Sequence, residues 1–354
     1  MSALALIRPD LLAIQPYDIK HEDLDCPLHA NELPWSPLTL AGVTLNRYPT
    51  SAPKNQLRQL LADYYQIKAE ELLLTRGSDD GIDLLMRLFL RAGIDSILQC
   101  PPTFSMYAFY ACLQQAGVIN CPLQENDQGF SMDLNALDTL WQPNCKLIMI
   151  CRPNNPTGEL IDLATIARLC AHYVNRAVIV VDEAYIEFAT ALSAASLIPQ
   201  FDNLVVLRTL SKAYGLAGLR IGAVISQTPL IEALRKVTAP FTLSSAVVAL
   251  AIEALQDKTW FVNSQQCISQ LRAQLALSLQ QCAWIEHVYP SSSNFLLIKT
   301  RQAAGLADWL LQHDIAIRAF TTSPLQQHLR ITVGNEEQNK KLLTALAAFD
   351  GDLA

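Results

Sequence analysis

Lys212 has neighbours that suggest a specific chemistry. It lies in the segment TLSKAYGLAGLRIG (residues 209–222), where hydroxyl side chains, glycines and an arginine surround one lysine. A lysine amine can form a Schiff base with an aldehyde, and Ser211 and Arg220 can donate hydrogen bonds to a phosphate. Glycines let the backbone approach a bulky ligand. The segment therefore predicts a site for a covalently held phosphorylated aldehyde, although many loop lysines are merely solvated.

Two further candidates follow the apolar run VIVV at residues 178–181. Asp182 and Tyr185 come at the carboxyl end of this expected strand, the edge at which open α/β sheets bind ligands. A buried carboxylate beside a pyridine nitrogen keeps that nitrogen protonated, which makes the ring a better electron sink. The alternative is that Asp182 only caps the next segment.

Three segments upstream carry polar or aromatic groups that could contact a cofactor. In RPNNPTG, Asn155 could donate to a phenolate oxygen, but Asn-Pro and Thr-Gly are also ordinary turn formers. In RGSDDGIDLL, Ser78 and Asp79 would begin a helix whose amides could bind an anion, or they could serve only as caps. Tyr107 in PPTFSMY could stack on an aromatic cofactor or pack in the core.

The elements that must position these groups alternate between apolar runs and helical patterns from about residue 72 to residue 237. This rhythm is typical of βαβ units and predicts an α/β fold with a mostly parallel sheet. Strands are expected at 72–75, 96–100, 146–151, 177–181, 204–208 and 220–225, and helices at 79–91, 104–116, 160–174 and 229–237. Near-continuous apolar strands indicate that helices cover both faces of the sheet.

After residue 240 the pattern changes. A helical stretch from 244 to about 279 is long enough to link two domains. Short strands are then expected at 285–289, 295–299, 316–319 and 329–333, and helices at 302–312 and from 336. This mixture is typical of a smaller α+β domain. We expect a large cofactor-binding domain at 42–243 and a small domain made of 1–41 and 244–354.

The overall composition excludes several classes of function. The 354 residues are 51% hydrophobic, enough for a sizeable core. The net charge of -7 and the lack of a basic stripe argue against a nucleic-acid partner. No apolar run has the length of a membrane span. The nine cysteines never form a CxxC pair, so they predict no metal site and no disulfide framework, and they favour the cytoplasm.

Together these motifs resemble the fold-type I pyridoxal 5′-phosphate (PLP) enzymes of the aminotransferase class. The matching residues occur in the family's order: Asn155, Asp182, Tyr185, Lys212 and Arg220. The resemblance extends from about residue 28 to residue 334. It implies PLP as the cofactor, and a large domain whose mostly parallel sheet is flanked by helices, next to a smaller α+β domain.

The resemblance also implies a role for each residue. Lys212 would hold PLP as a Schiff base and move the proton, and Asp182 would pair with the pyridine nitrogen. Tyr107 would stack on the ring. The ring oxygen would be contacted by Asn155 and Tyr185, and the phosphate by Ser78, Asp79, Ser211 and Arg220. Tyr48 would reach over from a second subunit, which implies a homodimer with shared active sites.

Within the class, the motifs LHANELP, NRYP, VVDEAYIEF and LRITVG are most similar to the histidinol-phosphate aminotransferases. This implies transamination between L-histidinol phosphate and 2-oxoglutarate, giving imidazole-acetol phosphate and L-glutamate in histidine biosynthesis. Arg330 would grip the anion of either substrate, which suits a planar guanidinium. Arg318, Tyr17 and Asn31 match further substrate-binding positions, although Arg318 could form only a surface ion pair.

Departures from the family pattern lie on the substrate side, at His29, Ala319, Phe320 and His328. They leave open an aromatic amino-acid aminotransferase or a PLP-dependent decarboxylase of the same fold. A third hypothesis, from another class, is a binding protein that senses PLP without turnover. The absence of an appended DNA-binding region and the filled catalytic positions argue against this third hypothesis.

Overall fold

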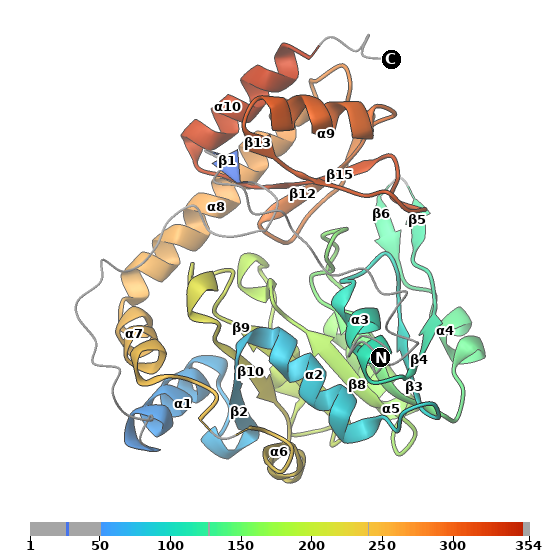
Figure 1. Cartoon of the computed structure of the whole chain (residues 1–354), viewed down its shortest axis with the longest axis vertical. Helices are drawn as coiled ribbons and strands as arrows, with labels where there is room; N and C mark the ends of the chain where they lie inside the picture. The colour runs from blue at the N-terminus through green and yellow to red at the C-terminus, as the bar shows by residue number, and fades with distance from the viewer. Residues whose placement is uncertain (1–25, 28–50, 127, 240, 350–354) are drawn as a thin grey trace, which may run out of the picture.

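The protein has two packed units joined by a long helix (Figure 1). The computed structural model describes residues 26–27, 51–126, 128–239 and 241–349. One unit is built on a seven-stranded sheet and the other on a four-stranded sheet. Helix α8 (Lys258–Leu279) runs from the first unit to the second along one side of the molecule.

The seven-stranded sheet is mostly parallel, as the sequence predicts. Its strands lie in the order β2 (Leu72–Thr75), β10 (Gly222–Ile225), β9 (Leu204–Thr209), β8 (Val178–Asp182), β7 (Cys145–Cys151), β3 (Ser96–Gln99) and β4 (Gly117–Asn120). The five strands β9, β8, β7, β3 and β4 run parallel to one another. Strand β10 runs antiparallel to both β2 and β9. The carboxyl ends of β7, β8 and β9 therefore meet at one edge.

Helices cover both faces of this sheet. Successive residues of a strand point to opposite faces, so Val180 joins a different apolar cluster from Ile179 and Val181. The cluster around Val180 includes residues of α2 (Gly77–Phe89), α3 (Met106–Leu113) and α6 (Thr228–Arg235). The opposite cluster includes residues of α1 (Ser51–Tyr65), α4 (Leu134–Leu140), α5 (Leu163–His172) and α7 (Ser245–Gln256). The buried, β-branched strands thus fit the expected three-layer α/β arrangement.

The smaller unit contains an antiparallel sheet in the order β11 (His287–Val288), β12 (Phe295–Lys299), β15 (His328–Thr332) and β14 (Arg318–Ala319). Its apolar core combines these strands with α8, α9 (Ala303–Gln312) and α10 (Glu336–Ala347). The pair β1 (Cys26–Pro27) and β13 (Ile315–Ala316) is parallel and brings a piece of the N-terminal region to this unit. The domain limits expected from the sequence stay a prediction.

Several elements differ from the sequence-based expectation. The helical stretch expected at 244–279 is two helices, because Asp257 interrupts it. The Asp257 carboxylate accepts a hydrogen bond from the Trp260 amide at 2.8 Å and so caps α8. The sequence analysis also missed α1, α4, β4 and the hairpin of β5 (Gln124–Asn126) and β6 (Gly129–Ser131). Short 3₁₀ helices complete the fold at Ala69–Glu71, Ile186–Phe188, Ala194–Leu197 and Ala217–Leu219.

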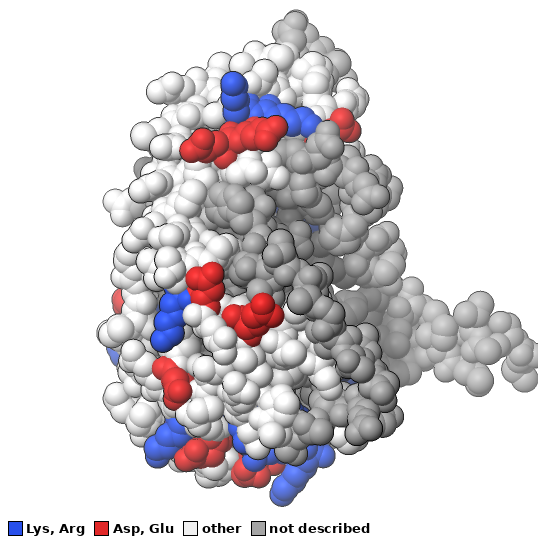
Figure 2. Space-filling model, turned by 90° about the vertical axis from the view of Figure 1, so that its left-hand side faces the viewer, with Lys and Arg blue, Asp and Glu red and all other residues white. Residues whose placement is uncertain are grey.

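Within the described ranges, no helix has the length and apolar character needed to cross a lipid bilayer. On the face shown in Figure 2, acidic and basic side chains of the described residues lie beside one another in small groups. The cysteines from Cys100 to Cys282 are free thiols.

Candidate active site

A pocket of about 490 Å³, partly open to solvent, lies at the carboxyl edge of the large sheet. The parallel strands β7, β8 and β9 end there, so the loops that follow them converge. Its wall includes predicted cofactor residues from four separate segments: Ser78, Asp79, Asn155, Asp182, Tyr185, Ser211, Lys212 and Arg220. The fold thus brings together residues that are up to 142 positions apart in the sequence (220 minus 78).

Asp182 is the buried acid of the pocket. It is the last residue of β8, and only 2% of its surface is exposed. The Tyr107 hydroxyl donates to Asp182 Oδ2 at 2.8 Å, and the Ala184 amide donates to Oδ1 at 3.1 Å. Burial raises the pKa of Asp182 to about 6, while both hydrogen bonds lower it. The carboxylate is therefore positioned by two neutral donors and faces the pocket.

Tyr107, for which the sequence predicts a stacking role, does not line the described pocket. Tyr107 is fully buried beside Asp182, whereas Phe104 lies on the pocket wall. The two rings meet edge to face, with centroids 5.6 Å apart. Helix α3 begins at Met106, so Tyr107 shares the buried face of the helix with Ala111, four residues later. The i, i+4 spacing of Tyr107 and Ala111 is a signal for the burial of Tyr107. The place of Phe104 on the pocket wall depends on where the helix begins, which this spacing does not fix.

Lys212 follows β9 in a loop that is held by its own side chains. The Ser211 amide donates to the Thr209 hydroxyl oxygen at 3.1 Å, and the Thr209 and Ser211 hydroxyls are 3.0 Å apart. Lys212 Nζ lies 5.8 Å from the centroid of the Tyr185 ring. Thr209 also lines the pocket, and the sequence analysis had not assigned it a role. The loop therefore presents the lysine amine from a fixed turn.

One side of the pocket is suited to an anion. Ser78 and Asp79 lie in the first turn of α2, where free amides and the helix dipole favour negative charge. Arg220 NH1 donates to Ser211 Oγ at 3.2 Å, and its NH2 lies 3.2 Å from Asp79 Oδ2. A side chain at Gly222 would place its Cβ 2.3 Å from the Gly77 carbonyl carbon. Glycine is required there because the two backbone segments touch.

Asn155 on the pocket wall connects the two units. Arg330 comes from β15 of the smaller unit, is 8% exposed, and its NH1 donates to Asn155 Oδ1. Asn155 Nδ2 donates to the Tyr185 hydroxyl at 3.4 Å. Arg318 lies opposite Arg330 in the β14–β15 register, with its guanidinium 5.9 Å from the Phe320 ring centroid, and it is not part of the described pocket wall. Tyr17, Asn31 and Tyr48 lie outside the described residues.

The chemistry of this donor set fits PLP. Arg220, two serine hydroxyls and a helix N-terminus suit a phosphate, and Lys212 supplies an amine for an aldehyde. The buried Asp182 supplies a carboxylate for a ring nitrogen. An aromatic side chain, Phe104, closes the wall.

The sequence agrees with this geometry. Residues 12–346 match the family model of aminotransferases of class I and II. The chain belongs to this aminotransferase family. It is 50% identical over 355 aligned residues to histidinol-phosphate aminotransferase 1 of Legionella pneumophila (strain Lens), a match that covers 100% of this chain and 97% of the relative. The histidinol-phosphate aminotransferase of Stenotrophomonas maltophilia (strain R551-3) is 38% identical, with 98% and 96% covered.

Solved structures of related proteins share the fold of this aminotransferase. The histidinol-phosphate aminotransferase of Sinorhizobium meliloti, in complex with PLP, superposes with a TM-score of 0.83 at 25% identity, covering 92% of this chain and 90% of that one. A Thermus thermophilus aspartate aminotransferase mutant has a TM-score of 0.79 at 20% identity, covering 97% and 99%. The second likeness concerns the fold alone.

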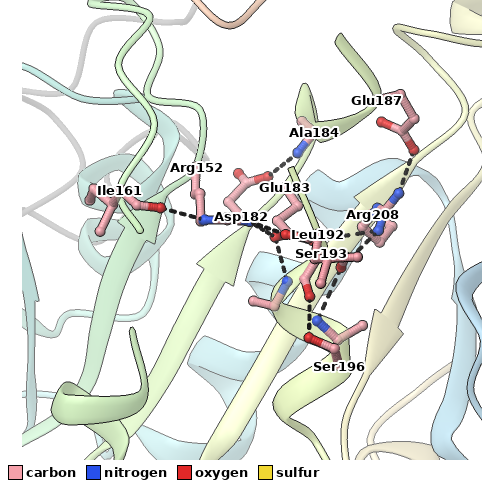
Figure 3. Close-up of polar contacts among 12 residues, drawn as sticks. Arg152, Ile161, Asp182, Glu183, Ala184, Glu187, Leu192, Ser193, Ser196 and Arg208 are labelled. Carbon is pink, nitrogen blue, oxygen red and sulfur yellow. Dashed lines mark hydrogen bonds and ion pairs between the residues drawn. The ribbon is translucent and has the colours of Figure 1, made fainter. Parts of the chain in front are cut away.

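Next to the pocket of this aminotransferase lies a buried network of charges (Figure 3). Glu183 accepts hydrogen bonds from Arg152 NH1 at 2.6 Å and from the Ala194 amide at 2.8 Å. Arg208 NH1 lies 3.4 Å from Glu183 and its NH2 lies 2.6 Å from Glu187. The Ser193 hydroxyl donates to Glu183 Oε2. The sequence analysis missed this network, which links the strand ends that carry Asp182 and Lys212.

Proposed function

We propose that this aminotransferase binds PLP and transfers an amino group between L-histidinol phosphate and 2-oxoglutarate, as a step of histidine biosynthesis. The observation that carries the proposal is the convergence of Lys212, Asp182 and Asn155 at one pocket. Arg330 is hydrogen-bonded to Asn155 from outside the pocket wall. The name of the relatives that match the whole chain supports the choice of substrate.

The pocket residues would hold PLP from several directions. Ser78, Asp79, Ser211 and Arg220 would take its phosphate, and Asn155 and Tyr185 would contact the ring oxygen. Phe104, in place of Tyr107, would face the ring. When bound, PLP supplies an electron sink for the bonds at the substrate carbon that bears the amine.

Two side chains would then do the acid–base work. Lys212 would accept the proton from the reacting carbon of the substrate and return a proton in the next step. The amine lies above the Tyr185 ring, in a loop held by Thr209, so it would be presented to a substrate bound in the pocket. Asp182 would carry a negative charge opposite the ring nitrogen and keep that nitrogen protonated.

Arg330 would recognise the anionic end of each substrate. Histidinol phosphate carries a phosphate and 2-oxoglutarate carries carboxylates, and a guanidinium can bind either in a two-pronged manner. Because Arg330 already contacts Asn155, its guanidinium is held next to the proposed cofactor site. Arg318, Tyr17 and Asn31 stay predicted substrate contacts.

We also propose that the protein works as a homodimer in the cytoplasm. Tyr48 of a second subunit would complete the cofactor site, as the sequence resemblance implies. The free thiols of the described cysteines support a reducing compartment.

The decisive test is the visible absorption of the protein-bound cofactor. Purified protein with PLP should show a visible band that L-histidinol phosphate or glutamate discharges, and borohydride should trap the cofactor on the peptide that contains Lys212. In Lys212→Ala the trapped adduct should vanish and turnover should fall by a factor of at least about 10² to 10⁴. Lys236→Ala, which changes an exposed lysine, should keep both.

Other outcomes would select one of the alternatives. Faster discharge by phenylalanine or tyrosine would indicate an aromatic amino-acid aminotransferase, and release of CO₂ would indicate a decarboxylase. A bound cofactor that no amino compound discharges would indicate a PLP-sensing binding protein. If no visible band forms, the proposed function is wrong.

A further inference from the structure

We propose that Tyr107 is a positioning residue whose hydroxyl keeps the Asp182 carboxylate ionised and oriented toward the ring nitrogen of the cofactor. This inference deepens the proposed function and rests on the role it gives to Asp182.

The geometry separates Tyr107 from the residues that would touch the cofactor. Its side chain is fully buried and belongs to the apolar cluster between α3 and the large sheet. Its only polar group, the hydroxyl, donates to Asp182 Oδ2 at 2.8 Å. A tyrosine in a core position needs a partner for this group, and here the partner is the acid of the pocket. Tyr107 is therefore placed to act on the cofactor through Asp182.

The two oxygens of Asp182 have different donors. Oδ1 accepts from the Ala184 amide at 3.1 Å. That amide belongs to the chain segment just after β8, so it stays in place in any side-chain variant. Oδ2 depends on the Tyr107 hydroxyl, which comes from α3, 75 positions earlier in the sequence. One substitution on α3 can therefore remove one donor and leave the other.

The charges around Asp182 make this donor important. Asp79 on α2 and Glu183 next in the chain both raise the pKa of Asp182, and burial raises it most. Tyr107 on α3 lowers it by donating its hydrogen bond. Cys151 of β7 and Lys212, after β9, line the same pocket. Burial raises the pKa values of Tyr107 and Cys151 well above their ordinary range, so both groups keep their protons and the tyrosine stays a donor.

Removing the hydroxyl should therefore make Asp182 easier to protonate. A protonated Asp182 has no charge to stabilise a protonated ring nitrogen, and the ring then becomes a weaker electron sink. The effect should depend on pH, because at sufficiently high pH the carboxylate is ionised even without the tyrosine. A purely structural role for Tyr107 would reduce activity at every pH alike.

The test compares Tyr107→Phe with Tyr110→Phe, which removes a hydroxyl from a half-buried tyrosine of the same helix. Protonation of Asp182 is followed in the cofactor-free protein by its infrared carboxyl band, assigned by its loss in Asp182→Asn. We expect Tyr107→Phe to raise the pKa of Asp182 by about one unit. With PLP, the acid limb of kcat should move upward by a similar amount, so that turnover falls several-fold near pH 6 and recovers near pH 8.5. Tyr110→Phe should change neither.

A second variant covers the case in which Tyr107→Phe fails to fold. Replacement of Tyr107 by 3-fluorotyrosine keeps the ring and hydroxyl but makes the hydroxyl a stronger donor, so the pKa of Asp182 should fall. An unchanged infrared titration in the folded variants, or an equal loss of turnover at every pH, would overturn the proposal. The infrared result needs no cofactor, so it is separate from the test of the proposed function.

Discussion

Asp182 and Glu183 are neighbouring acids in the sequence, and the fold gives them opposite surroundings. Asp182 faces the pocket and is held by two neutral donors, the Tyr107 hydroxyl and the Ala184 amide. Glu183 is fully buried against the guanidinium groups of Arg152 and Arg208. Successive side chains at the end of a strand point to opposite sides, so a single residue step separates the two environments.

The difference shows how the protein divides stability from function. The charge of Glu183 is neutralised by buried arginines, and Arg208 is further covered by the Tyr65 ring, whose centroid lies 4.4 Å from the guanidinium carbon. Within the described part of the chain, the donors to Asp182 are the uncharged Tyr107 hydroxyl and Ala184 amide, and burial raises the pKa of Asp182 to about 6. Ionised Asp182 therefore lowers the stability of the cofactor-free protein. A positively charged ring nitrogen beside the carboxylate would offset this cost of burying its charge.

The largest expected effect on stability comes from Glu183→Gln. This change should lower the free energy of unfolding by about 3–5 kcal/mol, because it leaves buried guanidinium charge without its counter-charge. Urea denaturation of the cofactor-free protein at pH 7.5 measures the loss. The matched control is Glu232→Gln, which removes an exposed partner of Arg235 and should change stability by less than about 0.5 kcal/mol. Equal effects of the two variants would show that the buried network does not stabilise the fold.

Asp182→Asn should raise the free energy of unfolding of the cofactor-free protein, whereas Glu183→Gln should lower it. The folded pKa of Asp182, about 6, lies above its ordinary value of 3.8. Its contribution to stability is therefore present below about pH 4 and lost as the pH rises through 6. Since asparagine does not ionise, the cofactor-free variant should become more stable than the parent by up to about 3 kcal/mol at pH 8, and by little at pH 4.

Denaturation curves at pH 4.5, 6 and 8 measure how the stability difference between the variant and the parent grows with pH. The same variant should lose most of its PLP-dependent turnover, because the ring nitrogen loses its counter-charge. A stability difference that stays constant across this pH range would contradict the proposed environment of Asp182.

Sequence patterns predicted the elements whose signal is local. The strands at 72–75 and 295–299 have the predicted bounds, because their buried runs are bordered by clear changes in pattern. Residue types and order also placed Lys212, Asp182 and Asn155 on one sheet edge, where the structure brings them together. The roles of these residues stay predictions.

What the sequence did not predict depends on exact positions and on distant partners. The helix expected to begin at Phe104 begins at Met106, and the change of start decides which of two aromatic residues is buried. Arg152 and Glu183 are 31 positions apart and meet only because β7 and β8 are neighbours. The contact of Arg330 with Asn155 needs both units in place. No local pattern contains this information.

The smallest expected effect, from Ser193→Ala, sharpens the contrast between the two acids. The Ser193 hydroxyl donates to Glu183 and accepts from Arg208 NH1 at 3.0 Å. Its removal should cost about 1–2 kcal/mol of stability, less than Glu183→Gln, because the opposite charges of the network remain. Ser278→Ala, which removes an exposed hydroxyl bonded to the Gln274 carbonyl, should cost less than about 0.5 kcal/mol.

The pH dependence of kcat distinguishes the network from the pocket. Ser193→Ala should leave the acid limb of kcat in place, because the hydroxyl contacts Glu183 and not Asp182. Tyr107→Phe, in contrast, should move the acid limb of kcat to higher pH. If Ser193→Ala also moves the limb, Glu183 and Asp182 share one electrostatic environment, and the division between a stabilising acid and a functional acid does not hold. If it lowers stability alone, the two faces of this strand end act independently.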